Sequence, residues 1–389
     1  LGLEPFGQLS LLYNTAMTFH VVASLGLIMT GTKLVAEFAK TDKAKTGRIM
    51  ALCHYIALIS GGLVALLMLL TAPWIADTIL NESSLVTGVR LIALLLFFQV
   101  LADSTLGINL GFLAFRGIFV ANALTGICAL LFLVAGVYGW GIVGGLLGLS
   151  AAEAVRFGML YRLAHRSADE NGIPRTWRFP SEELSVLWHV SLPAMATLLL
   201  WLPVTWIGTL MLVREPGGFG EMGLFGAANQ WFSLLMFVPG VITQTILPIL
   251  SEQVSAGGRT EARHLALRSA AIMLVLVALI ALPLMVGSPL IASAYGPDFA
   301  DGALVFILMF AVAIAAAPQG ILSNYLAAEN RFWLRFRLNV LWAICYLIAA
   351  YSLVSHGAVG LTSAMIIAYA VRTLATLLHV LVKKSEPGL

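Results

Sequence analysis

The sequence predicts an all-α polytopic membrane protein, and three observations lead to that fold class. Of its 389 residues, 60% are hydrophobic and only 11% are charged, and the mean hydropathy is +0.95. A soluble domain is closer to half apolar and a quarter charged. Apolar runs of about 20 residues, long enough to cross the hydrocarbon core as helices, recur along the chain. These runs do not alternate polar and apolar residues as the strands of a membrane β-barrel would.

Windows of that length predict eleven spans. They lie at residues 9–30, 49–72, 90–112, 117–138, 141–163, 187–212, 222–247, 266–290, 302–326, 336–355 and 358–381. A polar stretch at 164–186 separates five spans in residues 1–163 from six in residues 187–389, and we interpret it as a cytoplasmic linker. The first lobe would then lack its first helix. The opening LGLEPFGQLSLLY, with its Gly and Pro residues, is expected to form an external turn after an upstream span.

The placement of charge predicts the orientation in the membrane. Lys and Arg gather in alternate loops, such as the loop from Lys33 to Arg48, whereas the other loops carry mainly Asp and Glu. Basic loops face the cytoplasm, so the C-terminus is expected inside and residues 1–8 outside. The sequence pI of about 8.8 therefore reports topology and does not indicate a nucleic-acid partner.

The two halves of the chain resemble each other. GIVGGLLGLSAAEAVR (141–156) aligns without a gap on GAVGLTSAMIIAYAVR (357–372), and NALTGIC (122–128) aligns on NVLWAIC (339–345). We therefore expect two pseudo-symmetric six-helix lobes of the same orientation, as in transporters with parallel repeats and a substrate path between their lobes. A duplicated channel or scaffold is the alternative.

Short stretches along the whole chain resemble one family. They are LGLEPFGQLSLLY, TKLVAEF before GRI, APWIAD, GLFGAANQW, LPILSE, YGPDF, LNVLWA and GAVGLTSA. In these the chain resembles the bacterial lipid-linked oligosaccharide (O-antigen type) flippases, in the superfamily that also holds multidrug-and-toxin extrusion proteins. The resemblance implies alternating access and movement of a lipid-pyrophosphate-linked oligosaccharide to the outer leaflet of the bacterial inner membrane. It also implies a monomeric transporter that works beside polysaccharide polymerase machinery.

Ionisable groups deep in spans are costly and usually functional. Asp103 and Glu153 are such acids, and both lie in the first half of the chain. We expect either of them to couple H⁺ or Na⁺ movement to transport. Glu153 and Arg156 are three residues apart on one helix face, so they are also expected to pair. A buried ion pair and a structural hydrogen bond are the alternatives to coupling.

Repeat-equivalent arginines are the candidates for substrate binding. Arg suits bidentate contacts with phosphate, and a lipid-linked sugar presents its pyrophosphate at the cytoplasmic membrane face. The three pairs are Arg48 with Arg263, Arg116 with Arg331 and Arg156 with Arg372. The alternative is that they anchor the helices at the cytoplasmic interface.

Amides and prolines complete the candidate set. Asn229 and Gln230 follow the second Phe-Gly and are expected to bind sugar, although helix–helix hydrogen bonds would explain them equally well. Pro193 and Pro203 fall in one span and predict a bend used in gating, with a static kink as the alternative. His20, isolated in its span, is interpreted as a packing residue.

Other functions are less well supported by the sequence. It contains no HExxH, GxSxG or P-loop motif, so a membrane-embedded glycosyltransferase or polymerase is not favoured. The three cysteines lie inside spans without metal-ligand spacing, and neither a metal nor an organic cofactor is expected. A drug/cation antiporter of the same superfamily remains the main rival, and it would favour acids and aromatics over paired arginines.

Overall fold

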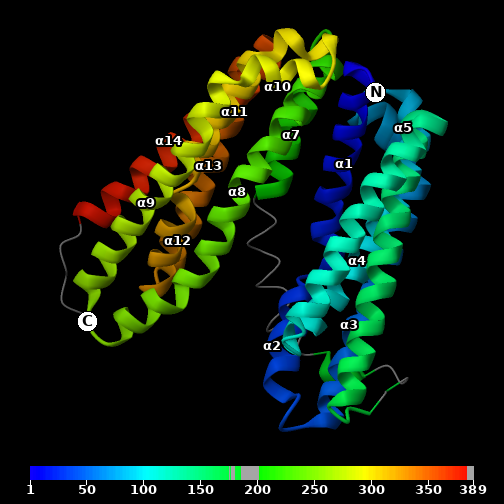
Figure 1. Ribbon diagram of the computed structural model, residues 1–389, viewed down its shortest axis with the longest axis vertical. Helices are drawn as coiled ribbons and strands as arrows, with labels where there is room; N and C mark the ends of the chain where they lie inside the picture. Colours follow the sequence, from blue (N-terminus) through cyan, green and yellow to red (C-terminus); the bar gives the residue numbers. More distant parts are fainter. Residues whose placement is uncertain (175, 177–179, 185–200, 383–389) are drawn as a thin grey trace. The chain divides into compact units, whose positions relative to one another are not determined.

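The computed structural model describes residues 1–174, 176, 180–184 and 201–382 (Figure 1). Every element in this part of the chain is a helix, and it contains no strand. The predicted all-α class is confirmed, and several of the helices are long and apolar.

The chain forms two compact units, one of Leu1 and Gln8–Trp206 and the other of Gly2–Gly7 and Ile207–Leu389. The helices up to the first unit's boundary are α1 (Leu3–Ser24), α2 (Leu27–Phe38), α3 (Lys43–Trp74), η1 (Ile75–Ile79), η2 (Ser83–Leu85), α4 (Val86–Gly111), α5 (Phe115–Glu170) and η3 (Ser181–Glu183). Those that follow are α7 (Trp201–Val213), α8 (Gly218–Ser255), α9 (Arg259–Val286), α10 (Ser288–Ala294), η5 (Pro297–Gly302), α11 (Ala303–Ala316), α12 (Gln319–Ala328), α13 (Phe332–Leu353), η6 (Val354–His356) and α14 (Gly357–Val382).

The opening stretch is a helix, so the expectation of an external turn there is wrong. Helix α1 begins at Leu3 and includes Pro5 and Gly7. A methyl group at Gly7 would overlap the carbonyl oxygen of Phe219, so this glycine allows the start of α1 to pack directly on α8 within the second unit. Pro5 is tolerated because the first turn of a helix has no backbone acceptor for its missing N–H.

The first predicted span is broken. Leu25 (φ 47°) and Gly26 (φ 68°) adopt left-handed conformations between α1 and α2, and the two helices bend by 42°. The continuous apolar run did not reveal this break. Beyond it, α2 packs closely on α4 because Gly31 and Gly107 face each other, and the hydroxyl of Thr32 donates to the carbonyl of Gly107 at 3.3 Å.

Two glycines at paired positions of the sequence repeat have the same backbone conformation. Gly141 (φ 58°, ψ −138°) follows a kink at Trp140 and divides α5 into two arms, as the separate predicted spans at 117–138 and 141–163 require. Gly357 (φ 65°, ψ −145°) starts α14 after η6. Both conformations are left-handed and favour glycine. The last helical arm of each half thus begins in the same way.

Seven helices of the described part are long and apolar enough to cross a membrane, or eight with the bent α1–α2 pair. Two of these segments, Phe115–Glu170 and Phe332–Leu381, each contain two of the predicted spans. The predicted span at 187–212 lies partly outside the described residues. The total of eleven therefore stays a prediction.

In the first unit α3, α4 and α5 run side by side (Figure 1). In the second, α14 packs on α11 and α13, and α12 packs on α8 and α9.

Candidate functional site

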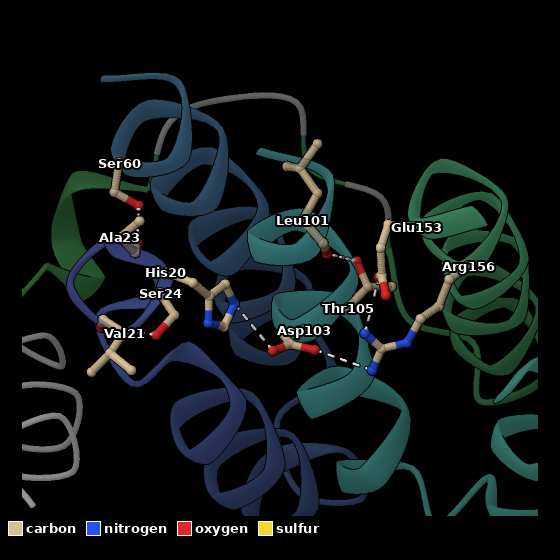
Figure 2. A network of polar contacts seen from close by, with 10 residues as sticks. All are labelled: His20, Val21, Ala23, Ser24, Ser60, Leu101, Asp103, Thr105, Glu153 and Arg156. Atoms are coloured by element: carbon tan, nitrogen blue, oxygen red, sulfur yellow. Dashed lines mark hydrogen bonds and ion pairs between the residues drawn. The ribbon is translucent and has the colours of Figure 1, made fainter. Parts of the chain in front are cut away.

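A polar cluster joins three helices of the first unit, as Figure 2 shows. His20 comes from α1, Asp103 from α4, and Glu153 and Arg156 from the second arm of α5. Arg156 Nη2 lies 3.1 Å from Asp103 Oδ1, and Arg156 Nη1 lies 3.2 Å from Glu153 Oε2. On the opposite side of the Asp103 carboxylate, His20 Nε2 lies 3.2 Å from Oδ2.

The cluster is largely shielded and carries more negative than fixed positive charge. The side chains of His20, Asp103, Arg156 and Glu153 are 13%, 17%, 18% and 20% exposed. Two carboxylates face one guanidinium, so with a neutral imidazole the cluster has a net charge of −1. A single proton on the imidazole or a carboxylate, or one bound monovalent cation, brings it to neutrality. This arrangement can therefore take up one positive charge.

Neighbouring groups hold the cluster in place. Arg156 Nε donates to Asn122 Oδ1 at 3.4 Å, which ties the two arms of α5 together. Thr105 lies two residues after Asp103 on α4. Its hydroxyl donates to the carbonyl of Leu101 at 2.7 Å and lies 3.2 Å from His54 Nε2. Among the described residues, no group of three or more His, Cys, Asp and Glu side chains has the geometry of a metal site.

Arg372, the repeat equivalent of Arg156, lies in very different surroundings in the second unit. Its Nη2 donates to the hydroxyl of Ser323 on α12 at 3.2 Å, and its buried Nε has no hydrogen-bond partner in the described part of the chain. One turn earlier on α12, the side-chain amide nitrogen of Gln319 donates to the hydroxyl of Thr373, and its side-chain oxygen Oε1 is buried without a hydrogen-bond partner among the described residues. These groups form a second polar cluster, between α12 and α14.

A second arginine adds to the positive charge of that cluster. Arg335 on α13 is half-buried and close enough to Arg372 to act on it electrostatically. Neither arginine has a carboxylate partner among the residues that the structure describes. Arg372, with an open donor beside hydroxyl and amide groups and a second arginine within electrostatic range, has the chemistry of an anion site.

The other four predicted arginines have separate surroundings. Arg48 Nε lies 3.1 Å from Glu183 Oε1 and so connects α3 to η3. Arg263 Nη2 donates to the carbonyl of Leu381 at 3.2 Å, and Arg331 Nη1 donates to Glu329 at 3.4 Å. Arg116 is exposed in a groove beside two other arginines. Arg48, Arg116 and Arg156 are the three predicted arginines of the first unit. In the described part of the chain, each has different neighbours, and no contact joins the three.

The amide candidates Asn229 and Gln230 lie on α8, whereas the Arg372 cluster lies between α12 and α14. Tyr295 Oη donates to Gln230 Oε1 at 3.2 Å and accepts from Trp231 Nε1 at 3.2 Å. Asn229 is half-buried. Of the two gating prolines, Pro203 lies near the start of α7, and Pro193 lies outside the described residues.

Sequence reasoning missed two members of these clusters. His20 was interpreted as a packing residue, yet it contacts Asp103. Arg335 is not among the predicted candidates, although it acts electrostatically on Arg372. The signal for His20 was present, because a titratable side chain within an apolar run needs a partner. Which partner it meets depends on how α1 packs against α4, and spacing along one helix cannot give that.

Comparison with known proteins places the chain among transporters. Residues 4–301 match the family described as polysaccharide biosynthesis protein, Polysacc_synt_3. The EPS I polysaccharide export inner membrane protein EpsE of Ralstonia nicotianae is 28% identical over 201 residues, 50% of this chain and 45% of that protein. EpsE of Ralstonia solanacearum is 27% identical over 230 residues, 57% of this chain and 50% of that protein. The matched region thus spans about half the length of these curated relatives.

Solved structures share the fold. An inward-facing multidrug resistance MATE family transporter of the MOP superfamily superposes with a TM-score of 0.82 at 14% identity, over 98% of this chain and 90% of that one. A MOP superfamily transporter from Pyrococcus furiosus, described as having a binding pocket of reverse polarity, gives a TM-score of 0.70 at 16% identity, over 97% and 88%. At such identities the likeness concerns the fold alone.

Proposed function

The chain belongs to the polysaccharide biosynthesis protein family, and on that premise we propose that it is a flippase for a lipid-pyrophosphate-linked oligosaccharide. It would move the lipid-linked sugar from the cytoplasmic to the outer leaflet by alternating access. The inner membrane is the proposed location, because the relatives from Ralstonia are named inner membrane proteins. The proposed division is a first lobe in residues 1–163, a cytoplasmic linker at 164–186 and a second lobe in residues 187–389.

The observation that carries this proposal is the unneutralised charge in the second unit. Arg372 and Arg335 have no carboxylate partner in the described part of the chain, and the buried Nε of Arg372 has a donor to offer. An isolated cation is costly to bury unless an anion compensates it. A pyrophosphate supplies that charge and accepts bidentate hydrogen bonds from guanidinium groups. Gln319 and Ser323 next to Arg372 could hydrogen-bond the adjoining sugar.

The cluster in the first unit supports a different role. Arg156 is already paired with Asp103 and Glu153, so it is a poor anion site. We assign the excess negative charge of this cluster to the uptake of one H⁺ or Na⁺ that drives the transport cycle. Asp103 would hold the ion, and His20 Nε2 lies 3.2 Å from its carboxylate.

Binding of the transported lipid tests the anion site. Purified protein in detergent is titrated with a lipid-pyrophosphate oligosaccharide, and its affinity is compared with that of the same lipid without phosphate. Arg372→Gln and Arg335→Gln should each weaken binding by about tenfold or more, because a hydrogen bond to a charged group contributes about 1.5–3 kcal/mol. Arg337→Gln is the matched control, since Arg337 is exposed on α13, the helix of Arg335, and its Nε donates to the Trp333 carbonyl at 3.4 Å. Equal affinities for all four proteins would refute the assignment.

A multidrug or cation antiporter is the second candidate. The negatively charged cluster in the first unit favours it, because an acidic site can bind an organic cation as well as a proton. Saturable binding of a small organic cation that Asp103→Asn abolishes, with no binding of the lipid-pyrophosphate, would establish this candidate instead.

A further inference from the structure

A groove in the first unit lies where the two ends of α5 meet. The helix folds back at Trp140 and Gly141, so its first residues pack against its last. The groove has a volume of about 650 Å³. Gly117 forms part of its lining, and a methyl group there would come within 2.6 Å of the Leu163 side chain, so glycine permits this close approach.

Three arginines line the groove. They are Arg116 from the first arm of α5, and Arg162 and Arg166 from the second. Arg166 Nε pairs with Glu170 Oε1 at 2.8 Å and remains 79% exposed. Arg116 and Arg162 are exposed and have no carboxylate partner in the part of the chain described. The lining holds three arginines and one acid, Glu170, so its net charge is about +2.

Apart from Ser167, the rest of the lining is apolar. Val120 and Leu163 contribute to the wall. Phe115 and Phe119 flank Arg116 in sequence, one helical turn apart on the same face of α5, and their side chains are 59% and 72% exposed. Exposed aromatic side chains beside cations are typical of helix ends at the membrane–water interface. The combination fits a ligand with an anionic group and hydrocarbon chains.

We propose that this groove binds the headgroup of an anionic glycerophospholipid of the bilayer. Basic pockets between transmembrane helices bind phosphate headgroups in this way, with the acyl chains on adjacent apolar side chains. The phosphodiester accepts hydrogen bonds from Arg116 and Arg162, and the chains lie along Phe119 and Val120. The lipid is a resident of the membrane, distinct from the transported one, and this proposed role for Arg116 differs from the predicted contact with the transported lipid. A retained lipid would hold the two ends of α5 together.

The test uses native mass spectrometry of the protein in detergent, titrated with phosphatidylglycerol or with phosphatidylcholine. The wild-type protein should retain phosphatidylglycerol with at least tenfold preference. The double variant Arg116→Gln/Arg162→Gln should lose that preference, and Arg116→Lys/Arg162→Lys should keep part of it. The control Arg337→Gln, an exposed arginine on α13, should behave as wild type. An unchanged far-ultraviolet circular-dichroism spectrum, and an unchanged thermal midpoint in detergent without added phospholipid, exclude misfolding of the double variant.

Three outcomes would overturn the proposal. One is equal retention of the two lipids by the wild-type protein. Another is a preference that survives the double glutamine variant. The third is displacement of phosphatidylglycerol by equimolar inorganic phosphate or lipid-pyrophosphate oligosaccharide, which would assign the groove to free phosphate or to the transported lipid. A tenfold change corresponds to about 1.4 kcal/mol, which such titrations resolve.

Discussion

Arg156 and Arg372 occupy the same position in the sequence repeat, yet their neighbours give them opposite chemistry. Asp103 and Glu153 both contact Arg156, whereas the repeat-equivalent positions hold Ala316 and Tyr369. Arg372 therefore keeps open donors, and one of its nitrogens is buried without a hydrogen-bond partner in the described region. A residue type at a repeated position does not define a function until its partners are known.

Removing the arginine of the acidic cluster should destabilise the protein. Arg156→Gln leaves Asp103 and Glu153 as two shielded carboxylates without their cation. Breaking a buried pair costs about 3–5 kcal/mol, and since these side chains are 17–20% exposed we expect about 1–3 kcal/mol. Thermal unfolding in detergent measures the loss. The double variant Arg156→Gln/Glu153→Gln should recover part of it, and a double variant no more stable than Arg156→Gln would contradict the charge account.

Ion coupling depends on the same cluster. Transport by the wild-type protein in vesicles should accelerate when a gradient of H⁺ or Na⁺ is imposed in the direction that drives the transport cycle. Asp103→Asn removes the excess negative charge, so the imposed gradient should no longer change the rate, while Asp77→Asn, an exposed acid in η1, should leave the response intact. A full gradient response in Asp103→Asn would exclude this residue from coupling.

Sequence spacing predicts some of these contacts and not others. Glu153 and Arg156 are three residues apart, and that spacing correctly predicts their ion pair. The contact of Asp103 with His20 and the electrostatic interaction of Arg335 with Arg372 join different helices. Such contacts depend on the rotation of each helix about its axis, which a nearly uniform apolar sequence leaves open. The functional roles of these residues stay predictions.

At the scale of the helices, glycines set the geometry. The two arms of α5 cross where Gly136 meets Gly144, and Gly148 lies against the backbone of Phe132. The sequence predicts the break in α5, because one apolar window ends at residue 138 and the next starts at Gly141, next to the kink at Trp140. It did not predict the bend between α1 and α2, since the apolar run continues through Leu25 and Gly26. Left-handed residues inside a hydrophobic run leave no trace in hydropathy.

The α5 crossing gives a stability prediction with a matched control. In Gly136→Ala the new methyl group would overlap the carbonyl oxygen of Gly144, so the arms must separate. Overpacking of this kind costs about 1–3 kcal/mol. Gly126→Ala, in the same arm, meets nothing within 4 Å and should be neutral or slightly stabilising. Thermal unfolding of both variants decides the matter, and equal stability would mean that the arms do not cross closely at Gly136.

At the scale of the whole molecule, the two units resemble each other in short stretches of sequence but differ in charge. The paired glycines Gly141 and Gly357 have matching conformations, which supports the internal repeat. The first unit places two carboxylates around its deep arginine, and the second surrounds its own with neutral polar groups and another arginine. This asymmetry suits a transporter that binds a driving cation in one unit and an anionic substrate in the other.

Transport in reconstituted vesicles tests that account most directly. The protein is given a lipid-pyrophosphate oligosaccharide in one set of vesicles and a small organic cation in another, and movement to the opposite leaflet or compartment is followed over time. The account predicts movement of the lipid-linked sugar, at a rate that Arg372→Gln lowers at least tenfold and Arg337→Gln leaves unchanged. Transport of the cation alone, or full transport of the sugar by Arg372→Gln, would contradict it.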